Sequence, residues 1–101
     1  MAWAGTLTDF KNGVTWTGAA NSDTTPAFTL TGGKYGVVTS STGTASATLQ
    51  IKDADGNFVA VGAAVTTYGT FDVPAGTYQV VMGATAGTAA GGVLPIPYRQ
   101  A

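Results

Sequence analysis

Short runs of alternating apolar and polar residues account for most of the chain. In the run Ala45 to Lys52, the apolar residues Ala47, Leu49 and Ile51 alternate with polar ones. This two-residue period places apolar side chains on one face of a β-strand. Further strands are predicted at Val14 to Gly18, Ala27 to Thr31, Tyr35 to Ser40, Phe58 to Ala63, Thr67 to Val73, Tyr78 to Ala84 and Gly92 to Tyr98.

The overall residue usage also favours β-structure. Strong helix formers are scarce, whereas Gly, Thr and Val, which favour turns and strands, are abundant. The stretches Thr39 to Ser46 and Gly83 to Gly92 are predicted to be loops. The sequence therefore predicts an all-β fold, an antiparallel β-sandwich of jelly-roll or Greek-key type with about seven or eight strands and a less regular N-terminal segment.

Two stretches share one template, FTLTGGKYGVV (Phe28 to Val38) and FDVPAGTYQVV (Phe71 to Val81). In each copy, Phe and the Leu or Val two residues later face the same side of a sheet. The shared glycine allows a sharp corner, and the shared tyrosine begins a new strand with its ring buried. The second copy contains VPAGTY, which is similar to the tyrosine-corner sequences of Greek-key sandwiches. We expect two equivalent corners within one sandwich.

Residues 1–23 are predicted to be an N-terminal arm or a first-strand segment that precedes a β-sandwich domain at residues 24–101. The segment contains Trp3, Phe10 and Trp16, and its first half shows no clean alternation. Two interpretations remain open for these aromatic residues. Their rings either anchor the segment in a pocket of a partner or complete the core of the sandwich.

The C-terminal stretch VLPIPYRQA is predicted to be an edge strand or an extended tail. Pro95 and Pro97 each remove a backbone hydrogen-bond donor, which a central strand rarely tolerates. Together with Tyr98, these prolines join the three aromatic residues of the N-terminal segment as candidate partner-binding residues.

The residue types that are missing exclude several kinds of chemistry. The 101 residues suit a single domain and include no cysteine, histidine or glutamate. Disulfides, zinc–thiolate sites and a histidine general base are therefore excluded. No nucleophile, base and orienting group can be assembled from what remains, so we predict no enzymatic activity and no cofactor.

Charged residues are unusually rare. They make up 9% of the chain, against about 25% in ordinary domains, and the net charge is −1. The four scattered cations do not make the basic footprint of a nucleic-acid-binding protein. No run approaches the ~20 apolar residues of a membrane-spanning helix, and the first residues lack the features of a signal peptide, so we expect synthesis in the cytoplasm.

So little charge also leaves self-association weakly opposed. One interpretation is that much of the surface is covered in a permanent assembly. The alternative is that threonine hydroxyls alone keep the surface solvated.

The densest group of oxygen ligands lies in KDADGN. Asp53, Asp55 and Asn57 have the spacing of the first three ligands of an EF-hand loop, but Phe58 stands where that loop needs glycine and no carboxylate closes it. Gly56 with either neighbour, between two alternating runs, is instead a strong signal for a short hairpin. We predict a hairpin with a solvated tip and no metal site.

Three motifs together carry a resemblance over Ala47 to Tyr98, about half of the chain. ATLQIKDADGNFVAVG, VPAGTYQVVMGATAG and the closing VLPIPY resemble small β-rich virion proteins of tailed bacteriophages, which combine a hairpin, a Pro-x-Gly-x-Tyr-x-Val corner and a hydrophobic last strand. The resemblance implies a non-enzymatic structural protein located in the virion, foremost a head decoration (cement) protein that binds and stabilises the assembled head.

This interpretation also names partners. The major capsid protein or another virion protein is expected to bind the chain, which would act as a homo-oligomer, a trimer or a dimer. Neither nucleic acid nor a membrane is an expected partner. The alternatives are a tail, neck or head-fibre component, or a glycan-binding β-sandwich module with an aromatic platform that the sequence does not locate.

Overall fold

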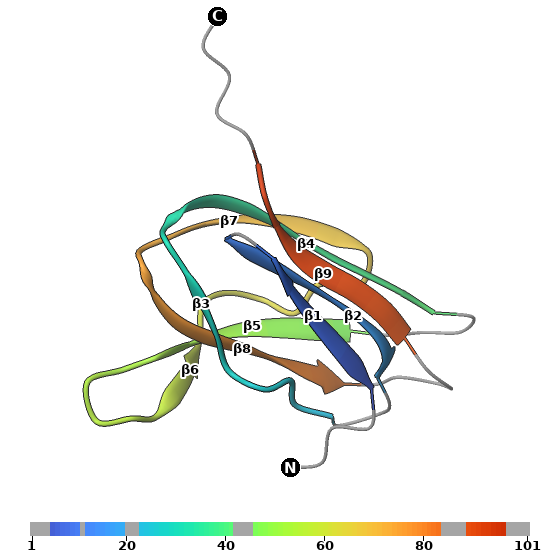
Figure 1. The fold of residues 1–101 in the computed structure, drawn as a ribbon, viewed down its shortest axis with the longest axis horizontal. Coiled ribbons are helices and arrows are strands. Elements are labelled where there is room, and N and C mark those ends of the chain that lie inside the picture. Colours follow the sequence, from blue (N-terminus) through green and yellow to red (C-terminus); the bar gives the residue numbers. More distant parts are fainter. Residues whose placement is uncertain (1–4, 11, 20–22, 42–45, 84–88, 97–101) are drawn as a thin grey trace, which may run out of the picture.

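The computed structural model describes residues 5–10, 12–19, 23–41, 46–83 and 89–96. Within these ranges the chain forms nine strands in two antiparallel sheets and has no helix (Figure 1). The strands are β1 (Thr6–Phe10), β2 (Gly13–Ala19), β3 (Phe28–Leu30), β4 (Gly33–Ser41), β5 (Ser46–Lys52), β6 (Phe58–Ala60), β7 (Tyr68–Val73), β8 (Gly76–Gly83) and β9 (Ala89–Pro95). One sheet has the order β1-β2-β9-β4-β7 and the other β3-β8-β5-β6. The predicted antiparallel β-sandwich is confirmed, with more strands than expected.

The strand order is that of a jelly roll. β2 pairs with β9, β3 with β8, β4 with β7 and β5 with β6, so the strands from β2 to β9 form one long antiparallel ribbon. The ribbon folds over on itself, which adds the pairings β4–β9 and β5–β8 and completes the two sheets. β1 extends the five-stranded sheet beyond β2. Of the two expected sandwich types, the jelly roll is the one that forms.

The turn between β5 and β6 closes this ribbon. Gly56 N donates to Asp53 O at 3.1 Å, and Asp53 N donates to Asn57 O at 2.7 Å. Gly56 has a φ of +89°, which glycine adopts without steric cost. Asp53 Oδ1 accepts the N–H groups of Asp55 and Asn57, both at 2.9 Å. The predicted hairpin is confirmed, but its loop is a β-turn followed by a glycine bulge and not a two-residue turn.

The two copies of the internal repeat lie where the ribbon folds over. The first copy crosses from β3 in the four-stranded sheet to β4 in the five-stranded sheet, and the second copy crosses back from β7 to β8. Phe28 lies opposite Tyr78 in the β3–β8 pairing, and Phe71 lies opposite Tyr35 in the β4–β7 pairing. The expectation of two equivalent corners is therefore confirmed.

Both corner tyrosines are buried and bond to the backbone of their own corner. The Tyr78 hydroxyl donates to Pro74 O, and the Tyr35 hydroxyl accepts the N–H of Gly32 at 3.1 Å. Gly32 has a φ of +97° and lies so close to the other corner that a Cβ there would be 2.9 Å from Ala75 N. Burial raises the pKa of Tyr78 above its usual value, and the nearby Tyr35 adds to this rise.

An apolar core fills the space between the sheets. The largest fully buried side chains include those of Trp16, Tyr35, Tyr78, Leu49 and Met82, which come from both sheets. In β8, and over the first part of β5, every second side chain is buried, as the alternation predicts. Burial of one such side chain stabilises the fold by about 1.5–3 kcal/mol, so this layer is what holds the sheets together.

The described part of the N-terminal segment belongs to the sandwich and is not an arm. β1 and β2 form a hairpin, and β2 pairs with β9 inside the five-stranded sheet. The side chain of Trp16 is 1% exposed, so it completes the core, and the interpretation of Trp16 as a partner anchor is wrong. The pattern does not reveal β1 because Asp9 occupies the inward position after Leu7.

The last strand differs from its prediction in two ways. β9 begins at Ala89, inside the stretch predicted to be a loop. The prediction missed this part of the strand because its small residues show no alternation. A small residue is needed at Gly91, where a Cβ would lie 2.1 Å from Val38 O. β9 is also a central strand and not an edge strand. It tolerates Pro95 because the pairing with β2 reaches only Val93, so Pro95 pairs with β4 alone.

Candidate functional site

The six candidate partner-binding residues do not form one surface that the structure describes. Trp16 is in the core, and Pro95 is half-buried at the end of β9. Four side chains lie outside the described part of the chain, those of Trp3, Phe10, Pro97 and Tyr98. Two other surfaces carry the groups that could bind a partner or ligand.

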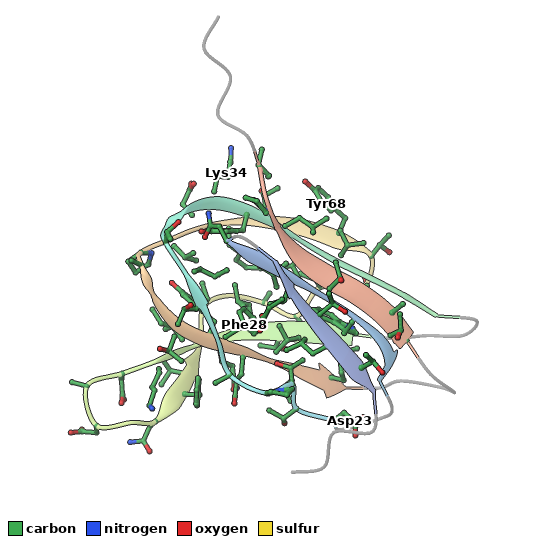
Figure 2. All side chains as sticks on the ribbon, in the orientation of Figure 1. Asp23, Phe28, Lys34 and Tyr68 are labelled. Atoms are coloured by element: carbon green, nitrogen blue, oxygen red, sulfur yellow. The ribbon has the colours of Figure 1, made fainter. Side chains whose placement is uncertain are left out.

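The first surface is the outer face of the five-stranded sheet. Tyr68 and Leu94 are 58% and 36% exposed there. Figure 2 shows Lys34 and Tyr68 pointing outward on one side of the molecule, whereas Phe28 lies between the sheets. The pairing register places these described residues on the outer face: Thr6, Thr8, Thr15, Thr17, Lys34, Gly36, Val38, Tyr68, Thr70, Asp72, Gly92 and Leu94.

The ring of Tyr68 lies over Gly36 on this face. A Cβ at Gly36 would be 2.9 Å from Cε1 of the ring, so glycine makes room for the ring to lie along the sheet. An aromatic ring that covers a strand glycine in this way shields the backbone beneath it. Leu94 is opposite Gly36 in the neighbouring strand β9, so Tyr68 and Leu94 flank the same glycine. Together they form an exposed apolar patch over β9, β4 and the edge strand β7.

Charge is nearly absent from this face. Among the outward residues that the structure describes, Lys34 and Asp72 are the charged pair, and they lie opposite each other in the β4–β7 pairing. Opposite charges at such a cross-strand position attract each other. The described face therefore carries no net charge, and a partner would meet mainly threonine, glycine and the apolar patch.

The second surface is a cleft between β1 and β3, the edge strands that lie on the same open side of the sandwich. The cleft has a volume of about 400 Å³, and the residues that line it are Asp9, Asn12, Ala27, Phe28, Thr29 and Thr31. Small-molecule sites have volumes of about 300–1,000 Å³, so the cleft has room for a ligand. Phe28 also lines the cleft but is only 4% exposed, so Ala27 is the exposed apolar residue of its wall.

Hydrogen bonds fix Asn12 at this cleft. Its backbone has a φ of +59°, which asparagine tolerates better than most residues. Its Oδ1 atom accepts the N–H of Thr31 at 2.8 Å and the hydroxyl of Tyr35 at 2.5 Å. The Thr31 N–H can only donate, so the atom that faces it must be the amide oxygen. The Asn12 NH₂ group is left without a partner among the residues that the structure describes.

Sequence reasoning missed Asp9, Asn12, Tyr68 and Leu94. One usable signal was Asn12-Gly13, a dipeptide typical of hairpin turns, which would have revealed β1 and with it the inward position of Asp9. The alternation carries a second signal, because Tyr68 lies two residues before Thr70 and so on the polar side of its strand, the side opposite Phe71.

Within the described ranges, no three His, Cys, Asp or Glu residues lie together as ligands for a metal ion. The same part of the chain contains no helix long and apolar enough to span a membrane. No protein-family model, curated protein or solved structure matches this chain.

Proposed function

We propose that the protein is a non-enzymatic structural component of a tailed-bacteriophage virion, a head decoration protein that binds the assembled head and stabilises it. In this proposal the outer face of the five-stranded sheet is the docking surface. The observation that carries it is the combination, on one face, of the exposed patch of Tyr68 and Leu94 with a single charge pair, Lys34 and Asp72, among the described residues.

The chemistry of this face suits a permanent contact. Removing apolar surface from water is the main favourable term in association, and charged residues are depleted at the centre of interfaces. Few charges have to be desolvated when this face is covered, because Lys34 and Asp72 are the charged residues among its described members. The partner would be the major capsid protein or another virion protein, and a trimer or dimer of this chain would engage several neighbouring subunits at once.

The fold adds support by analogy. Jelly rolls occur in viral capsid domains as well as in lectins, although a fold alone does not decide a function. The described parts of the three motifs that resemble phage virion proteins correspond to the β5–β6 hairpin, the corner at Tyr78 and the end of strand β9. Because the protein would bind assembled heads and not free subunits, it would stabilise the assembled state by mass action.

Sedimentation with genome-emptied heads of the phage that encodes the chain tests this proposal. We expect saturable binding by the native chain and a loss of at least about tenfold in affinity for the variant Tyr68→Ala/Leu94→Asp, since hot-spot residues contribute about 2 kcal/mol or more. The matched control is Val59→Asp, which places the same charge on a side chain that is 47% exposed on β6 of the other sheet.

The control should bind heads like the native chain, and circular dichroism should show that all variants keep their strands. Absence of binding by the native chain, or equal losses in both variants, would reject the proposed docking face. Binding to purified tails in place of heads would reassign the protein to a tail or neck component.

A further inference from the structure

We propose that the cleft between β1 and β3 binds one sugar residue, with Asp9 and Asn12 as its main polar contacts. This inference goes beyond the docking role, because the cleft lies at the open edge of the sandwich and not on the outer face. The side chain of Asp9 is on the inner side of β1, opposite the buried Val14, whereas the docking face holds its neighbour Thr8.

The cleft gathers polar groups that have no hydrogen-bond partner among the described residues. Asp9 is exposed and has no ion-pair or hydrogen-bond partner among the described residues. Thr29 and Thr31 are exposed and add two hydroxyl groups to the wall. With the unpaired NH₂ of Asn12, the cleft offers an acceptor, a donor and two groups that can do either.

This set of groups matches neighbouring hydroxyls of a sugar ring. Each sugar hydroxyl can donate to the Asp9 carboxylate while it accepts from the Asn12 NH₂ group, so one pair of hydroxyls satisfies both side chains. Hydrogen bonds to a charged group are the stronger kind, which makes Asp9 the leading contact. The exposed Ala27 and the small accessible part of Phe28 supply the apolar side of the cleft for the C–H side of the ring.

The fixed orientation of Asn12 argues against a cationic ligand. Because Oδ1 is already occupied by Thr31 N–H and the Tyr35 hydroxyl, the amide presents its NH₂ side. An ammonium group has only donors, so it would pair with Asp9 but leave two donors facing each other at Asn12. A neutral polyol has no such conflict.

The inward carboxylate of Asp9 also has an effect at the edge of the sheet. An inward charge on an edge strand opposes pairing with a strand of another molecule. The variant Asp9→Lys retains an inward charge and so preserves that role, but it removes the acceptor. It therefore separates protection of the edge from ligand binding.

The test is a titration of the ¹⁵N-labelled chain, followed by NMR, with the methyl glycosides of glucose, galactose, mannose and N-acetylglucosamine. A small open cleft predicts weak binding, with a Kd of about 1–10 mM. We expect saturable shifts for at least one glycoside at the amides of Asp9 and Thr29 and at the side-chain NH₂ of Asn12. A free sugar and the terminal sugar of a glycan share this chemistry, and comparing each glycoside with its free sugar separates the two sources.

Three variants complete the design. Asp9→Asn and Asp9→Lys should weaken binding at least about tenfold, because each removes a charged acceptor. Asp55→Asn is the matched control, since Asp55 is exposed at the β5–β6 turn, and it should bind like the native chain. Unchanged melting temperatures would show that all three variants remain folded.

Several outcomes would overturn the proposal. They are the absence of saturable shifts with all four glycosides and their free sugars, shifts that map away from the cleft, and saturation by butylammonium chloride in place of any sugar. Binding to heads is measured separately and uses other residues, so failure of this test leaves the docking face unaffected.

Discussion

Phe28 lies directly opposite Tyr78 across the β3–β8 ladder, and the second copy of the repeat returns the same arrangement with Phe71 opposite Tyr35. The repeat thus reflects a ribbon that folds over once. The phenylalanine of each copy lies opposite the tyrosine of the other copy. The polar ends of the two tyrosines bond to the backbone of their corners, while the rings fill the core. The two corners therefore affect the stability of the fold, its dependence on high pH and its topology.

Removing the Tyr78 hydroxyl should destabilise the protein. Tyr78→Phe leaves the ring in place but deprives Pro74 O of its donor, and we expect the free energy of unfolding to fall by about 1–2 kcal/mol. Urea unfolding measures the change. Tyr68→Phe is the control, because that ring is 58% exposed, and it should change the free energy by less than about 0.5 kcal/mol. Equal effects of the two substitutions would contradict the corner account.

The raised pKa of Tyr78 predicts a loss of stability at high pH. In the unfolded chain a tyrosine loses its proton near pH 10, but in the fold burial and the nearby Tyr35 hold the Tyr78 proton to higher pH. Above pH ~10 the unfolded state therefore binds fewer protons than the folded state, and stability falls as pH rises through the folded pKa. Below pH ~10 the contribution is fully present.

Urea unfolding at a series of pH values between about 8 and 11 checks this dependence. The native chain should lose stability more steeply above pH ~10 than Tyr78→Phe does, and absorbance of tyrosinate should report the delayed ionisation. Parallel curves for the two proteins would show that Tyr78 is not the group responsible.

Much of the fold could be predicted because it follows from local periodicity. The alternation of Leu49 with its polar neighbours and the template around Tyr35 and Tyr78 predict strands, corners and burial, since these depend on residues close in sequence. The pairing order could not be predicted, because it depends on which distant strands meet. The small residues of β9 show no alternation. In β1 the alternation is broken because the polar Asp9 occupies an inward position.

Two buried threonines give a matched prediction about hydrogen bonding. Thr25 Oγ1 accepts the N–H of Val80 at 3.0 Å, whereas Thr39 Oγ1 is buried without a partner among the described residues. Thr25→Val should lower the free energy of unfolding by about 1–2 kcal/mol. Thr39→Val should leave it unchanged or raise it by about 1 kcal/mol, because it removes an unsatisfied hydroxyl and keeps the shape.

Thermal and urea unfolding of both variants measure the difference. A clear destabilisation by Thr39→Val would mean that a water molecule or another group bonds to that hydroxyl in solution.

The Asp53 side chain should stabilise the β5–β6 turn by accepting hydrogen bonds and not by binding a metal ion. Asp53→Ala removes the acceptor of two N–H groups and should cost about 1 kcal/mol, while Asp53→Asn retains an oxygen and should cost less. Calcium should leave the melting temperature of the native chain essentially unchanged. A rise of several degrees on addition of calcium would contradict this account of the turn.

The functional surfaces were harder to predict than the fold. Trp16 was a candidate partner anchor because it is aromatic, but it is buried in the core. Hydrophobicity alone does not distinguish an anchor from a core residue. Tyr68 is exposed because it lies on the same side of β7 as the polar residues Thr70 and Asp72, which its aromatic ring alone does not reveal. The cleft requires β1 and β3 to lie at the same edge of the sandwich, which depends on the pairing of distant strands and not on any local motif.

Cryo-electron microscopy of the native phage particle tests the proposed function most directly. The account predicts density for a nine-stranded jelly roll on the outside of the head, with the five-stranded sheet against the capsid protein and Tyr68 and Leu94 within the contact. Contact through the four-stranded sheet would contradict the docking face. Absence of the protein from the head would contradict the decoration role itself.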